Sequence, residues 1–92
     1  MGEFLTYKGK PLVRNKNVIY YGNMSDRFVI KFEVLSTKKE DGVNKADRIE
    51  VMLLNNDPDL KEEERIVKHS EKQGFYEAMD FGSIWLERAL KG

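Results

Sequence analysis

The chain has 92 residues, enough for one folded domain but too few for two independent hydrophobic cores. Apolar residues make up 40% of it, charged residues 35%, and the formal net charge is zero, a composition typical of globular proteins. The absence of cysteine excludes a disulfide framework, a thiol nucleophile and a cysteine-bound metal centre. No apolar run approaches the roughly 20 residues of a transmembrane helix, and the N-terminus lacks a signal-peptide pattern. We therefore expect residues 1–92 to form a single cytoplasmic domain that does not associate with a membrane.

The charges are unevenly divided along the chain. Residues 1–45 contain nine Lys/Arg and five Asp/Glu, a balance of +4, whereas residues 46–92 contain seven and eleven, a balance of −4. Such an asymmetry can steer a charged partner. It is also what a basic sheet edge beside an acidic helix start produces, and this second interpretation is the simpler one.

Two segments in the first half alternate with the period of a strand that buries one face. The inward positions are Phe28, Ile30, Phe32 and Val34 in the first segment and Ile49, Val51 and Leu53 in the second. The polar residues 38–45 between them include a glycine and predict a hairpin loop. Together the two segments predict a pair of antiparallel strands.

Shorter apolar segments precede this pair. A turn is predicted at Asn15–Asn17, since asparagine tolerates left-handed backbone angles, and a further strand containing Leu5 and Tyr7 is predicted before the Lys8-Gly9 turn. Four or five short strands that follow one another closely predict an antiparallel meander over residues 4–55, approximately.

The second half is predicted to be helical over about residues 58–91. Asp57 is a candidate N-cap, Pro58 suits the first helical position, and acidic residues follow in the first turn. Ser70 and Gln73 have the spacing of a capping box for a second helix. Gly74 lies either inside that helix or at a break between two helices. The predicted fold is α+β, with one or two C-terminal helices packed on one face of the meander.

Residues 75–90 form an amphipathic helix on a helical wheel. Gly82 lies in its apolar arc, where a core side chain is expected. Its small size favours a close approach to a bulky strand residue such as Phe28, Phe32 or Tyr20. The alternative, the floor of a ligand pocket beside Trp85, is less well supported because the alanines of the same arc also favour close packing. Ile84 falls on the polar arc and is a weak hint of contact with another chain.

Catalytic and metal-binding patterns are incomplete. Asp80–Gly82 has the letters of the kinase magnesium motif without the other motifs or length of a kinase. Asn55, Asp57 and Asp59 have alternate calcium-loop spacing, but a leucine replaces the required glycine. His69 is the only histidine and has no partner at a diagnostic spacing. We expect no enzymatic activity, no metal site and no cofactor.

One candidate interface is basic and aromatic. Four cations follow one another without an intervening acid, and two tyrosines lie nearby, as in small domains that bind single-stranded nucleic acids. These residues are Lys8, Lys10, Arg14, Lys16, Tyr20 and Tyr21. Zero net charge and the absence of a known RNA-binding motif count against this interpretation.

The outer face of the sheet is the other candidate, since it is half apolar where a solvated face is normally polar. Its residues are Val29, Leu35, Met52 and Leu54, with Ile84 on the helix. Either the N-terminal hairpin covers this face, or another protein or a second copy does. The favoured function is a non-enzymatic protein-interaction or self-associating module. Nucleic-acid binding is the alternative, and a small-ligand sensor with a pocket between helix and sheet is the third.

Overall fold

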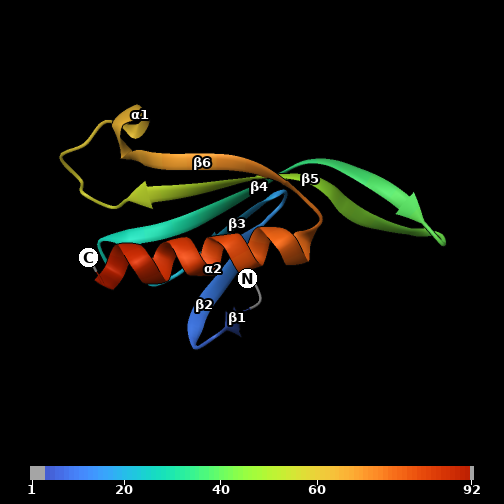
Figure 1. Ribbon diagram of the computed structural model, residues 1–92, viewed down its shortest axis with the longest axis horizontal. Helices are drawn as coiled ribbons and strands as arrows, with labels where there is room; N and C mark the ends of the chain where they lie inside the picture. The colour runs from blue at the N-terminus through green and yellow to red at the C-terminus, as the bar shows by residue number, and fades with distance from the viewer. Residues whose placement is uncertain (1–3, 92) are drawn as a thin grey trace.

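Six strands form one antiparallel sheet whose spatial order is their order in the sequence, and a long helix lies across one face of it (Figure 1). The computed structural model describes residues 4–91. The strands are β1 (Phe4–Tyr7), β2 (Lys10–Asn15), β3 (Val18–Tyr21), β4 (Phe28–Glu40), β5 (Val43–Asn55) and β6 (Ile66–Gln73). The helices are α1 (Glu62–Arg65) and α2 (Phe75–Lys91). The predicted α+β meander with a C-terminal helix is confirmed, with one strand more than predicted.

The central hairpin β4–β5 is longer than predicted. Each strand has 13 residues, and the polar segment expected to be a loop is mostly strand. The turn is confined to Asp41 and Gly42, whose φ angles of 52° and 78° are left-handed, as a two-residue hairpin turn requires. Beyond about residue 37, β4 and β5 pair with each other and extend past the other strands of the sheet. We call residues 37–46 the arm, which points away from α2 in Figure 1.

The segment between β5 and α2 is predicted to be helical, but only the four residues of α1 are. Asp57 accepts a hydrogen bond from the backbone N–H of Asp59, so it stabilises a turn instead of capping a helix. The four-residue α1 follows, and then β6 pairs with β5 along residues 66–73. Pairing with the open edge of β5 satisfies the backbone of this segment, whereas its sparse apolar residues would bury little as a helix.

Gly74 separates β6 from α2, so it lies neither inside a helix nor between two helices, the two positions that the sequence predicts. Its φ of +85° reverses the chain direction at no steric cost, and its N–H donates to the Asp47 carbonyl at 2.8 Å. The predicted capping box of Ser70 and Gln73 is wrong, because both residues lie in β6.

The core lies between α2 and the concave face of the sheet. All seven inward positions predicted on the two long strands belong to it or pack against it. Gly82 marks the closest approach: a Cβ at this position would lie 2.6 Å from Cζ of Phe32. The close-packing interpretation of this glycine is therefore confirmed, and Phe32, of the three candidates, is the residue it contacts.

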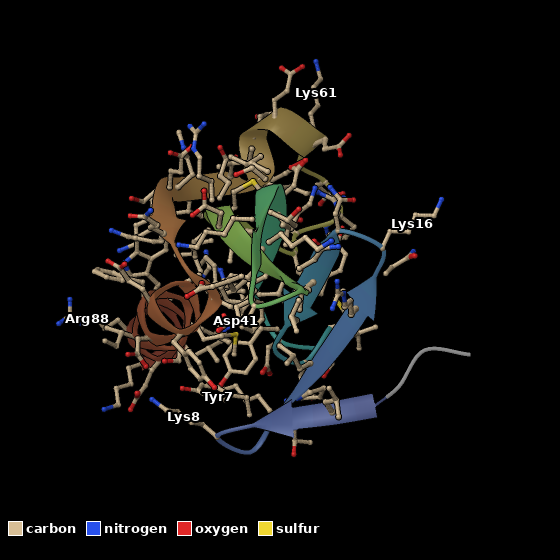
Figure 2. The ribbon with its side chains drawn as sticks, turned by 90° about the vertical axis from the view of Figure 1, so that its right-hand side faces the viewer. Tyr7, Lys8, Lys16, Asp41, Lys61 and Arg88 are labelled. Atoms are coloured by element: carbon tan, nitrogen blue, oxygen red, sulfur yellow. The ribbon has the colours of Figure 1, made fainter. Side chains whose placement is uncertain are left out.

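The sheet curves around α2, and both of its ends contact the helix (Figure 2). On the β6 side, Lys72 Nζ lies 3.7 Å from the centroid of the Phe81 ring and Lys68 Nζ lies 4.8 Å from that of Trp85. On the β1 side, Lys8 Nζ donates to Ser83 Oγ at 3.4 Å. These contacts close the two sides of the core. Neither helix of the described residues is long and apolar enough to cross a membrane.

Candidate binding groove

The five residues of the predicted interaction face do not form one exposed surface. Val29 and Met52 are only 1% and 5% exposed, and Leu54 is half-buried. Leu35 and Ile84 are exposed, but Ile84 belongs to α2, on the opposite side of the sheet from Val29 and Met52. The most apolar part of the predicted face is therefore already covered within the chain.

The N-terminal hairpin does not provide this cover. It curls toward α2, where Tyr7 packs edge-on against Tyr21 with their ring centroids 5.8 Å apart. Val29 instead lies beside Gly22, directly after β3, where an added Cβ would come within 3.5 Å of its side chain. The interpretation that β1–β2 covers the outer face is not what the structure shows.

The residues of the predicted nucleic-acid face are dispersed. Lys8 lies against α2, and Tyr21 is buried with its hydroxyl donating to the Tyr7 carbonyl at 2.8 Å. Tyr20 and Tyr21 are neighbours in a strand and so point to opposite faces of the sheet. Lys10 lies at the start of β2, whereas Arg14 and Lys16 lie at its far end and its turn. Of this set, Arg14 and Lys16 line one groove, and Lys16 and Tyr20 line a smaller hollow at the β2–β3 turn.

The groove that Arg14 and Lys16 line has a volume of about 1100 Å³ and lies on the helix side of the sheet. Its apolar floor is the margin of the core, with Leu12, Ile19, Val34, Ala46 and Phe75. Its other lining residues are Leu5, Arg14, Lys16, Thr37, Lys38, Glu40, Asn44, Lys45, Gly74 and Tyr76. An apolar floor with a few charged groups at the margin is the usual character of a ligand site.

Three elements build the groove. The β4–β5 arm forms one wall, the end of β2 and the β2–β3 turn form another, and the first residues of α2 close its inner end. Figure 2 looks along the arm from its tip: Asp41 lies in the middle of the view, between α2 on one side and the turn that carries Lys16 on the other. The groove exists because the arm extends beyond the strands that α2 covers.

The rim of the groove is cationic. The charged residues that line it are one carboxylate, Glu40, and four cations, Arg14, Lys16, Lys38 and Lys45. In the part of the chain that the structure describes, the ion pairs are Arg48–Glu71 and Lys91–Glu87, and neither includes a groove cation. Among residues 4–91, the Arg14 guanidinium donates only to the Lys16 carbonyl, at 3.1 Å. These four positive charges are therefore available to an anion.

Lys38 and Lys45 occupy directly opposed positions of the arm. Like charges at opposed positions of an antiparallel pair destabilise the pairing. A bound anion would relieve this repulsion, so binding would also stabilise the arm.

Among the described residues, Tyr76 is the most exposed large hydrophobic residue, at 90%, and it lies at the inner end of the groove. No sequence motif includes Tyr76, and Lys38 and Lys45 lie in a segment that the sequence predicts to be a loop. An aromatic residue outside the apolar arc of the helical wheel was the available signal for Tyr76. No pattern in the sequence places Lys38 beside Arg14.

The remaining candidate residues form no second site. His69 is exposed on β6, and Asn55 and Asp57 accept hydrogen bonds from the backbone of their own turn. Among residues 4–91, no three His, Asp or Glu side chains are grouped as a metal site would need. Comparison with family models, curated proteins and solved structures finds no match to this chain.

Proposed function

We propose that this domain is a non-catalytic binding module whose groove accepts an anionic ligand with apolar surface. The observation that supports this most directly is the combination of an apolar floor with one carboxylate and four cations that form no ion pair within residues 4–91. The floor favours burial of apolar ligand surface, and the rim favours negative charge. Helix α2 begins at the inner end of the groove, and the helix dipole adds a positive potential there.

Protein interaction or self-association through the outer face is the competing hypothesis. It is based on Val29, Leu35, Met52 and Leu54, and of these Val29 and Met52 are buried within the chain. A substitution such as Met52→Glu would place a charge in a buried position and destabilise the fold, so it is unsuitable as a test of association. Leu35 is the residue of that face whose substitution leaves the core intact.

The groove can be tested with two fluorescent probes of similar shape. Anilinonaphthalene sulfonate carries a negative charge, whereas phenylnaphthylamine is neutral. We expect the anionic probe to bind the native protein more tightly, and its advantage over the neutral probe to shrink as salt is added, because the rim charges are exposed and screened.

The double variant Lys38→Glu/Lys45→Glu should abolish the preference for the anionic probe. The matched control is Lys61→Glu/Lys91→Glu, which changes the net charge equally at exposed positions outside the groove. The control should retain the preference. Equal probe affinities in the native protein, or equal losses in the two double variants, would exclude the groove as an anion site.

A further inference from the structure

We propose that the ligand of the groove is single-stranded nucleic acid, with phosphates at the cationic rim and a base stacked on Tyr76. This inference depends on the proposed function, because it names the ligand of the same groove. Three features carry it: the distribution of the cations, the exposed aromatic ring and the shape of the site.

The cations lie on both walls of the groove. Arg14 and Lys16 come from the β2–β3 side, and Lys38 and Lys45 come from the arm. A ligand with a single anionic group would contact one wall. A nucleic-acid strand carries a negative charge at every nucleotide, so that successive phosphates can contact both walls.

Tyr76 presents an aromatic ring that packing within the chain does not use. It is 90% exposed, whereas its neighbour Phe75 is half-buried against the core and tilts against Phe32 with a centroid distance of 6.0 Å. An exposed ring beside a cationic groove is the usual platform for an unpaired base. Stacking would cover the Tyr76 ring, and the apolar floor would accept the next base or its sugar.

A double helix fits these features less well than a single strand. Paired bases are stacked on one another and offer no free face to Tyr76, except at an end. An acidic peptide would satisfy the rim charges, but its apolar side chains need no flat ring, so Tyr76 distinguishes the two ligands. The groove therefore favours an unpaired strand over both alternatives.

The direct test is fluorescence anisotropy of labelled oligouridine and oligothymidine of about 12 nucleotides, a length in the range that small single-strand-binding domains cover. If all four cations contact phosphates, the affinity should fall about 50-fold between 50 and 200 mM salt. A duplex of the same length and a polyglutamate peptide are the competing ligands. Binding of either one more tightly than the single strands would overturn the inference.

Two substitutions separate stacking from charge. Tyr76→Ala should weaken single-strand binding by about 5- to 150-fold, the range that loss of one stacked base produces, without changing the salt dependence. Tyr76→Phe should stay within about 2-fold of the native protein, since the ring remains. Lys38→Glu/Lys45→Glu should reduce the salt dependence, whereas Lys61→Glu/Lys91→Glu should leave it unchanged.

Different results would contradict the anion-binding proposal and the single-strand proposal. If the anionic probe shows the expected preference but no oligonucleotide binds, the single-strand assignment is wrong and the anion-binding groove stands. If neither binds, both proposals are wrong. If oligonucleotides bind but Tyr76→Ala and Tyr76→Phe behave alike, stacking on Tyr76 is excluded.

Discussion

Gly82 is the residue at which α2 and the sheet come closest, and it offers a sharp test of the packing. Alanine has the higher helix propensity by about 1 kcal/mol, which favours Gly82→Ala. Its Cβ would however lie 2.6 Å from Cζ of the fully buried Phe32, so that either this side chain or the helix has to shift. We expect Gly82→Ala to reduce the free energy of unfolding by about 1–3 kcal/mol, measured by urea denaturation.

Asp80→Ala provides the control, since it raises the helix propensity at an exposed position of the same helix. It should be neutral or slightly stabilising. If Gly82→Ala is as stable as the native protein, the contact with Phe32 relaxes without a loss of free energy of unfolding.

Tyr21 couples the stability of the domain to alkaline pH. Burial raises the pKa of its hydroxyl above the usual value of 10.0, and the charges of Tyr7 and Glu87 act in the same direction. Because the folded pKa exceeds the unfolded one, the contribution of this group is complete below about pH 10 and is lost as the pH rises through the folded pKa. We therefore expect the free energy of unfolding to fall above about pH 10.

Tyr21→Phe should remove this part of the alkaline fall. At neutral pH it should cost about 0.5–1.5 kcal/mol, because the hydrogen bond to the Tyr7 carbonyl is lost. Denaturation at neutral and alkaline pH measures both effects, with Tyr76→Phe as a control for an exposed hydroxyl. An unchanged pH dependence in Tyr21→Phe would assign the alkaline fall to another group.

The β4–β5 arm and the body of the sheet differ as elements. In the body of the sheet, β4 and β5 are flanked by β3 and β6 and covered by α2, whereas the arm is a two-stranded ribbon with mostly exposed side chains. Isolated two-stranded ribbons are marginally stable in water. Hydrogen exchange should therefore be much faster at amides of residues 37–46 than at those of residues 49–53. Equal protection would mean that something other than the described contacts holds the arm.

Ligand binding should change this pattern. A strand of nucleic acid in the groove would contact one wall that belongs to the arm, so the exchange of arm amides should slow when oligouridine is added. Retention of fast exchange in the bound state would place the ligand elsewhere on the domain.

The shape of the whole molecule reflects the arm. The principal extents are 44 × 24 × 23 Å, with a radius of gyration of 13.3 Å over Cα atoms. Because Val29 and Met52 are buried, the outer face exposes less apolar surface than the sequence predicts, and we expect an elongated monomer at micromolar concentration. X-ray scattering on a size-exclusion column measures both shape and mass. A dimer that Leu35→Glu dissociates would instead support association through the outer face.

The strand period, the turn residues and the amphipathic helix determined the α+β meander, the inward faces of β4 and β5 and the packing role of Gly82. These are local patterns, and each is visible within a few neighbouring residues. The strand β6 was missed because residues 66–73 have no clear alternation, and they become a strand by pairing with the open edge of β5. Tertiary pairing here outweighed the local signals of a capping box and an acidic helix start.

The candidate site could be predicted only in fragments. Arg14 and Lys16 were identified as cations, but Lys38, Lys45 and Tyr76 lie far from them in the sequence and were assigned to a loop and a helix. Their meeting depends on how far the arm extends past α2 and on the curvature of the sheet. The sequence by itself determined the order of β1–β5 and α2 and the buried faces of β4, β5 and α2, because these follow from local periodicity. Only the tertiary structure decided which surface is covered and which charges share a groove, because both depend on contacts between distant residues.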